Sequence, residues 1–234
     1  MKNMRYFFAA AAIILAASCG GNTIDPDNPN GNGGGGTTAR HGKVGTPVDL
    51  GLSVKWASWN VGAEKPEENG DYFAWGETEP KDSYSWDNYK WMKDNQISKY
   101  TGPDGDAKTV LDPEDDVAHV AWKGKWRMPT IEELKELEDN CDWEWGSLNG
   151  VDGFTIKSKT NGNSIFLGLS GTFSSWLSSE GEYGFLWTSS YHDDWQKNSQ
   201  YSYYLNMYKE VGPLKRNSNY NSRYLGYPVR PVME

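Results

Sequence analysis

"PTIEELKELEDNC", residues 129–141, is the stretch that decides the fold class. Thr130 and Glu133 have the spacing of a capping box, in which each side chain accepts a hydrogen bond from the other residue's backbone N–H. Side chains near helical spacing then follow and line one face: Ile131, Leu134, Leu137 or Glu138, and Cys141. The pattern predicts an amphipathic helix, with Cys141 as a small buried side chain at its end rather than a reactive thiol.

A second helix is expected just before it, over "LDPEDDVAHVAWKG", residues 111–124. Asp112 is placed as the N-cap, Pro113 occupies the first helical position, and acidic residues fill the first turn. Gly124 ends the pattern. The face expected to be buried carries three small or branched apolar residues: Val117, Val120 and Ala121.

Strands are predicted around the two helices. The chain has 12 Trp, 14 Tyr and 26 Gly, and its short aromatic and β-branched runs are separated by Gly, Asn, Asp and Ser. These runs are "VDLGLSVKWASWNV", "YFAWGE", "GFTIKS", "NSIFLGLSG", "FLWTSS" and "SYYLNM". The sequence therefore predicts an α+β fold in which short strands are joined by long loops. We expect Trp56, Trp59, Trp75, Trp126 and Trp187 to belong to its core.

The N-terminus has the layout of an export signal. Lys2 and Arg5 precede the apolar residues 6–17, which are too few to cross ~30 Å of hydrocarbon. Small residues then lead into Cys19, an arrangement similar to the bacterial lipobox, in which the cysteine is diacylated and begins the mature protein. We expect a lipoprotein signal peptide over residues 1–18 and lipidation at Cys19. The alternative is an ordinary signal peptide cleaved near Ala17.

Residues 19–43 are expected to be a tether. Gly, Asn, Asp and Pro dominate this segment, and Ile24 is its only large apolar residue, so it cannot bury enough surface to offset its ordering entropy. Residues 44–234 form one domain's worth of chain with no further linker. With Cys19 acylated, Cys141 has no intramolecular partner, so no disulfide framework is expected.

The charge of the chain narrows the classes of partner. There are 23 Lys and Arg against 32 Asp and Glu, a formal net charge of −9. Removal of residues 1–18 takes away two cations and no acids, which gives −11. Nucleic-acid binding needs clustered Lys and Arg, and docking on anionic lipid needs a basic surface. We expect neither of these partners.

Several blocks of the sequence together resemble a known family. They are "VDLGLSVKWASWNVGAEKPEENGDYFAWGE", "WKGKWRMPTIEELKEL", "NGNSIFLGLSG", "GFLWTSS" and "RYLGYPVRPV", in this order over nearly all of residues 48–232. They resemble the Fibrobacter succinogenes major paralogous domain, found in secreted and lipid-anchored proteins abundant in Bacteroidetes and Fibrobacter. The resemblance implies a C-type-lectin-like fold, with short twisted antiparallel strands, two short helices and long loops. It implies a scaffold that displays a variable loop surface, and no reaction.

Catalytic and metal-binding patterns are sparse. Ser189, His192 and Asp193 sit side by side without a nucleophile elbow, so a triad is not expected. Paired carboxylates for glycoside hydrolysis remain a minor alternative. Calcium is a further possibility, because oxygen ligands gather in residues 102–116, although their spacing matches no known loop. These oxygen ligands are Asp104, Asp106, Asp112, Glu114, Asp115 and Asp116.

Ligand-binding candidates concentrate in the last third of the chain. In residues 201–208, "YSYYLNMY", alternation places Tyr201, Tyr203, Leu205 and Met207 on the core face. The opposite face is expected to be an exposed row: Tyr204, Asn206 and Tyr208. The flanking loops add further candidates: Tyr191, His192, Asp193, Asp194, Trp195, Asn219 and Tyr220.

Flat rings beside amides and carboxylates suit sugars, and the same residues suit a protein partner. The sequence therefore predicts a non-catalytic binding module, lipid-anchored in the outer membrane at the cell surface, with a glycan as the favoured ligand. A protein-binding adhesin or a component of a surface complex is the alternative, and a hydrolase is the third choice.

Overall fold

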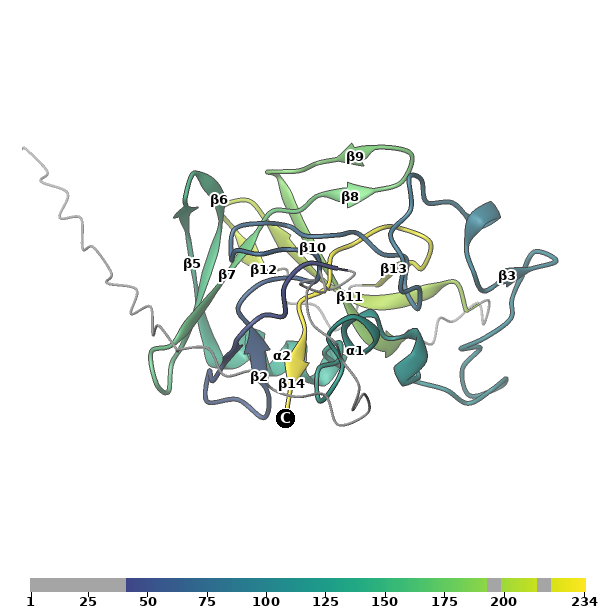
Figure 1. Ribbon diagram of the computed structural model, residues 1–234, viewed down its shortest axis with the longest axis horizontal. Helices are drawn as coiled ribbons and strands as arrows, with labels where there is room; N and C mark the ends of the chain where they lie inside the picture. Colours follow the sequence, from purple (N-terminus) through teal and green to yellow (C-terminus); the bar gives the residue numbers. More distant parts are fainter. Residues whose placement is uncertain (1–40, 193–198, 214–219) are drawn as a thin grey trace, which may run out of the picture. The chain divides into compact units, whose positions relative to one another are not determined.

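The computed structural model describes residues 41–192, 199–213 and 220–234, and these residues form an α+β domain (Figure 1). Its strands pair antiparallel in small sheets. One sheet has the order β1 (Pro47–Val48), β2 (Lys55–Ala57), β14 (Val232–Met233). Another has the order β5 (Cys141–Leu148), β6 (Val151–Ser158), β7 (Ser164–Gly168). The α+β class expected from the sequence is confirmed.

The central sheet contains the longest strand. It is built from β10 (Tyr183–Tyr191), β11 (Tyr201–Tyr208), β12 (Gly212–Pro213) and β13 (Tyr220–Ser222), with both β12 and β13 paired to β11. The remaining strands form two short hairpins. They are β3 (Met92–Lys93) with β4 (Gln96–Ile97), and β8 (Thr172–Phe173) with β9 (Leu177–Ser178).

The helix predicted after residue 130 is confirmed as α2 (Ile131–Asn140). The Thr130 hydroxyl accepts from the Glu133 N–H, and the Glu133 carboxylate accepts from the Thr130 N–H at 2.8 Å. Arg127 holds the same carboxylate with two bonds of 2.6 and 2.8 Å. The buried face contains Ile131 and Leu134 as predicted, and both Leu137 and Glu138, which were predicted as alternatives. Cys141 is buried and begins β5.

The helix predicted over residues 111–124 is wrong in its extent. The chain forms a 3-10 turn, η2 (Pro113–Asp115), and then the separate helix α1 (Val117–Trp122). Asp116 caps α1, because its carboxylate accepts from the His119 N–H and, through its other oxygen, from the Met128 N–H. Because α1 starts afresh after η2, the residues it buries differ from those predicted for one continuous helix. Val117, Ala118 and Trp122 are therefore buried, whereas Val120, which we expected in the core, is 39% exposed.

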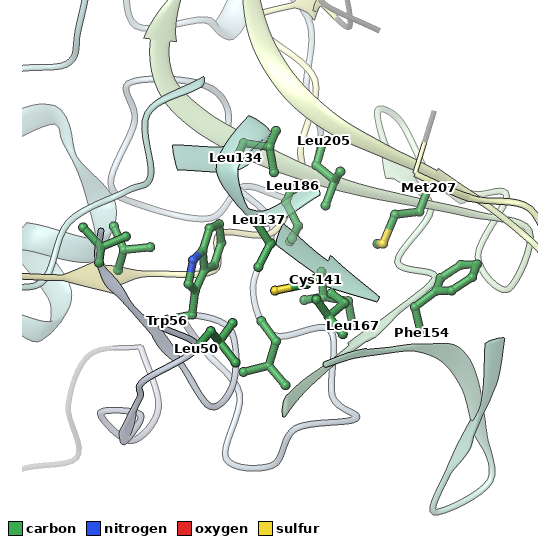
Figure 2. Packing of buried hydrophobic residues seen from close by; sticks show 14 of the residues in the cluster. Leu50, Trp56, Leu134, Leu137, Cys141, Phe154, Leu167, Leu186, Leu205 and Met207 are labelled. Carbon is green, nitrogen blue, oxygen red and sulfur yellow. The ribbon is translucent and has the colours of Figure 1, made fainter. Parts of the chain in front are cut away.

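Two hydrophobic clusters cover opposite faces of β10 and β11. In one, shown in Figure 2, Leu134 and Leu137 of α2 lie against Leu186 and Leu205, and Cys141 lies near Leu137 and Leu167. The other contains Trp187 of β10 and Tyr204 of β11, the neighbours in sequence of Leu186 and Leu205. Four of the five tryptophans expected in the core are buried, namely Trp56, Trp75, Trp126 and Trp187, and Trp59 is partly buried.

The domain begins earlier than the sequence indicated. His41 is 3% exposed, and its carbonyl accepts from the Gly62 N–H. Lys43 forms an ion pair with Glu64 at 2.9 Å. Both residues were assigned to the tether, and both belong to the folded part. Cys19 and the rest of the tether and signal segment, residues 1–40, lie outside the described residues.

Candidate functional site

Two adjoining cavities, each of about 390 Å³, open between the β3–β4 hairpin, the 101–105 loop and the start of β11. Asn95 and Gln200 line both cavities, so we treat the two as one trough. Its first half is lined by residues that include Ile97, Thr101, Asp104, Tyr191 and Ser199. The second half is lined by Trp86, Asp87, Met92 and Asp94 besides the shared residues.

The β3–β4 hairpin places Asn95 where the two cavities meet. Met92 pairs with Ile97 and Lys93 with Gln96, which leaves Asp94 and Asn95 as a two-residue turn. Both turn residues have positive φ, 48° and 60°. This is the type I′ geometry that two-residue hairpins favour, and Asn and Asp are among the residues that tolerate it. The tight turn thereby fixes the backbone of Asn95 where the two cavities meet, and its side chain is exposed there.

Trp86 gives the second cavity a rigid aromatic wall. It begins the 3-10 turn η1 (Trp86–Asn88), and its partly buried ring has edge-to-face contacts with two tyrosines. The ring centroids are 5.6 Å from Tyr89 and 4.9 Å from Tyr224. Such contacts contribute about 0.5–1.5 kcal/mol each beyond area burial. The indole is therefore held in place before any ligand arrives.

The loop over residues 101–105, beside the first cavity, follows a strained tyrosine and is held by a carboxylate. Tyr100 is fully buried with φ 59°, an uncommon conformation for a bulky residue. Asp106 accepts from the backbone N–H groups of Tyr100 and Thr101 at 2.6 and 3.0 Å. Burial alone would raise the pKa of Asp106, but these bonds outweigh it and the pKa is lowered. Arg223 donates to the carbonyl of Tyr100 at 2.7 Å and completes the support.

The calcium candidates have other partners. Oxygens of Asp112, Glu114 and Asp115 lie close enough together to share a cation. The Lys99 ammonium occupies this position, 2.7, 3.8 and 2.6 Å from the three carboxylates in that order. Asp106 binds backbone N–H groups and Asp116 caps α1, so their carboxylates are also engaged. Asp104 lies apart from this cluster, in the trough.

Asp115 is the centre of this ion cluster. Lys90 binds one of its oxygens at 2.8 Å, and Lys99 and the Tyr100 hydroxyl bind the other at 2.6 and 2.7 Å. Burial would raise the pKa of Asp115, but the hydrogen bonds from these three donors outweigh burial and lower it. The cluster anchors residues 90–100 to η2 and so fixes one side of the trough.

The described ligand-binding candidates are divided among several places in the fold. Tyr191 lines the trough, where its ring faces the Arg223 guanidinium at 5.0 Å. His192 and Tyr220 lie together elsewhere, stacked with centroids 3.8 Å apart, and Tyr203 contacts His192 edge-on at 4.8 Å. Four further candidates, Asp193, Asp194, Trp195 and Asn219, lie outside the described residues.

The exposed row predicted on β11 is only partly correct. Tyr204 is buried, because Tyr227 and Trp187 pack against its ring at 5.4 and 6.1 Å. Asn206 is partly buried, and Tyr208 is 40% exposed. Tyr208 packs against Tyr183 of β10 at 4.9 Å. The row is therefore core at one end and surface at the other.

Ser189 is not placed as a nucleophile. It is buried, and its hydroxyl donates to the Pro129 carbonyl at 3.2 Å. A cavity of about 190 Å³ brings Ser189, His119 and Asp116 together. In that cavity the Asp116 carboxylate caps α1, and a ring nitrogen of His119 lies 3.3 Å from the Trp126 carbonyl. These polar groups hold the fold together.

Sequence reasoning missed most of the trough: among its described lining residues, Tyr191 was a ligand-binding candidate and Asp104 a calcium candidate, and the others were not singled out. One signal was available. The Asp94–Asn95 pair stands between Met92 and Ile97, which is a short hairpin pattern. Nothing in the sequence near Trp86 or Gln200 indicated a binding site, because these residues meet Asn95 only through the tertiary fold.

None of the helices in the described part of the chain is long and apolar enough to cross a membrane. No protein-family model, curated protein or solved structure matches the chain.

Proposed function

We propose that this protein is a non-catalytic binding module that captures a glycan in the trough. The observation that carries the proposal is the pairing of a fixed indole, Trp86, with the amides of Asn95 and Gln200 in two adjoining cavities. Each cavity is about 390 Å³. This lies within the roughly 300–1,000 Å³ typical of small-ligand sites.

The chemistry of the lining suits a sugar. An indole face covers the apolar C–H side of a pyranose ring, and amides and hydroxyls exchange hydrogen bonds with its hydroxyl groups. Trp86 and Met92 supply the apolar contact, and Asn95, Thr101 and Gln200 supply the polar groups. Because the Trp86 ring is packed against two tyrosines before binding, capture orders little of the apolar wall.

We further propose a C-type-lectin-like scaffold and membership of the Fibrobacter succinogenes major paralogous domain group. The ordered sequence blocks over residues 48–232 and the α+β architecture support both. In this proposal Cys19 carries the lipid, and residues 19–40 tether the domain to the outer membrane, at the cell surface. Cys19→Ser should move the protein out of the membrane fraction. Retention in that fraction would contradict the anchor.

The glycan proposal is tested with the full chain in detergent. A broad glycan array is screened first, and the glycans that bind are then titrated in solution while the intrinsic Trp fluorescence is followed. Trp86→Ala should abolish binding. Trp176→Ala is the matched control, because Trp176 is 69% exposed next to β9, outside the residues that line the trough. Binding that survives Trp86→Ala would move the site elsewhere, and silence across the array would contradict sugar capture.

A protein partner is the second candidate, and the exposed Trp176 favours it. A large ring at a hairpin turn, 69% exposed, is typical of an anchor residue in a protein interface. Under this alternative, Trp176→Ala should abolish partner binding measured with purified components, and added sugar should not compete. Loss of partner binding in Trp86→Ala alone would contradict it.

A further inference from the structure

We propose that the trough selects its glycan by charge: it favours amine-bearing sugars over neutral ones and rejects carboxylated or sulfated ones. This inference rests on the proposed glycan-binding function and specifies the ligand class of the same site. It follows from which charged residues line the two cavities and from where the nearby cations point.

Carboxylates stand at the Trp86 end of the trough. Asp87 follows Trp86 in η1, and Asp94 is the first residue of the hairpin turn. Both side chains are exposed and line the second cavity. Within the described part of the chain, neither of the two takes part in an ion pair. A sugar stacked on Trp86 would therefore sit beside two solvent-facing carboxylates.

Two of the three lysines near the hairpin are engaged in ion pairs. Lys90 and Lys99 flank the hairpin, but their ammonium groups bind Asp115 at 2.8 and 2.6 Å. Among the described residues that line either cavity there is no Lys or Arg. Lys93 of β3, which precedes Asp94, is exposed and does not line either cavity. The ion cluster thus engages Lys90 and Lys99. The charged residues among the described lining are carboxylates: Asp87, Asp94 and Asp104.

The expected size of the effect follows from Coulomb's law. Two unit charges about 4 Å apart in water interact by about 1 kcal/mol, which corresponds to roughly five-fold in affinity. The formal net charge of −9 adds a weaker, long-range repulsion of anionic sugars. Salt should reduce both effects, since the Debye length shortens from about 8 Å at 0.15 M to about 3 Å at 1 M.

The experiment compares sugars that differ only in charge. Full-length protein in detergent is titrated at pH 5.5 with gluco- and galacto-configured hexamers. Each is supplied in neutral, 2-amino and 6-carboxylate form. We expect the amine form to bind about five-fold tighter than the neutral form, and the carboxylate form at least five-fold weaker. In 1 M salt the three forms should converge.

Paired variants locate the cause. The Asp87→Asn, Asp94→Asn double variant should lose most of the preference, with only the weaker effect of the remaining negative charge left. Asn accepts the positive φ of position 94 as well as Asp does, so the turn is preserved. Glu144→Gln, a matched loss of charge on an exposed β5 residue, should keep the full preference.

The outcomes separate this inference from the function on which it rests. Binding of none of the six hexamers would overturn both. Binding of the neutral form with equal or tighter binding of its carboxylate would overturn charge selection alone. An undiminished preference in the double variant would also overturn it, because the selecting charge would then lie on other residues.

Discussion

Arg230 shows how one buried side chain can join distant segments. It is 1% exposed, and its guanidinium donates to the Asn60 side chain and to the carbonyls of Ala57 and Phe166, at 2.7, 3.0 and 2.9 Å. All three acceptors are uncharged, and burial lowers the pKa of the guanidinium. These bonds connect the strand β2, the segment after it and β7 to the C-terminal segment.

Removing this side chain should be costly. Arg230→Ala removes the donor to the Asn60 side-chain oxygen and to two backbone carbonyls, and each buried acceptor left unsatisfied costs about 1–3 kcal/mol. We expect the free energy of unfolding to fall by more than about 3 kcal/mol, as measured by urea denaturation. Lys157→Ala, an exposed residue on β6, should change it by less than about 0.5 kcal/mol. A small loss for Arg230→Ala would show that water replaces the guanidinium.

For single residues, the sequence predicts the burial of typical core side chains better than the burial of side chains whose partners come from distant segments. The buried tryptophans were predicted because they lie in the sequence blocks that resemble a family scaffold. The burial of Arg230 was not predictable, because arginine is mostly exposed and its acceptors lie 64 to 173 residues away. Tyr204 was expected on the surface because alternation describes one strand, whereas the ring of Tyr227, which covers it, comes from another segment.

Among the elements, the β3–β4 hairpin allows folding and binding to be separated. Asn95→Gly should keep the free energy of unfolding within about 0.5 kcal/mol, because glycine adopts positive φ without strain. The same change removes the amide shared by the two cavities, so glycan affinity should fall. Asn95→Val should lower stability by about 1–2 kcal/mol, since a branched side chain is disfavoured there. Denaturation and sugar titration of both variants measure these effects, and unchanged affinity in Asn95→Gly would exclude this amide from the site.

The start of α2 offers a prediction that depends on local chemistry alone. Thr130→Ala removes the hydroxyl that accepts from the Glu133 N–H, and loss of such a cap costs about 0.5–2 kcal/mol. Thr130→Ser retains the acceptor and should stay close to wild type. Equal losses in the two variants, measured by thermal or urea unfolding, would point to the methyl group of threonine instead of the cap.

The two helices show which elements sequence reasoning can define. The capping box of α2 lies within four residues, so its start was readable. The start of α1 depends on Asp116, which also binds the Met128 N–H twelve residues away. Asp112, expected as the cap, binds Lys99 and Lys108 instead. Tertiary partners therefore decided between two aspartates that the local pattern could not distinguish.

For the whole molecule, acid should be the destabilising condition. Hydrogen bonds and ion pairs from Lys, Arg and backbone N–H groups lower the pKa of Asp106, Asp112, Asp115 and Glu133. The stability that these groups contribute is complete above their unfolded pKa of about 3.9–4.3. It is lost as pH falls through their lower folded pKa values. Burial raises the pKa of Asp116, so this residue acts in the opposite direction to the other four.

We therefore expect the free energy of unfolding to decrease steeply below about pH 4. Asp115→Asn isolates the largest cluster. At pH 7 the variant loses the charge that binds Lys90 and Lys99 and should be less stable than wild type. As pH falls through the folded pKa of Asp115, wild type loses the same charge, so the difference between the two should shrink. Asp152→Asn, on the exposed side of β6, should match wild type throughout. Urea unfolding at pH 7, 5, 3 and 2 measures all three proteins, and a constant difference between wild type and Asp115→Asn would show that packing, not ionisation, explains the role of Asp115.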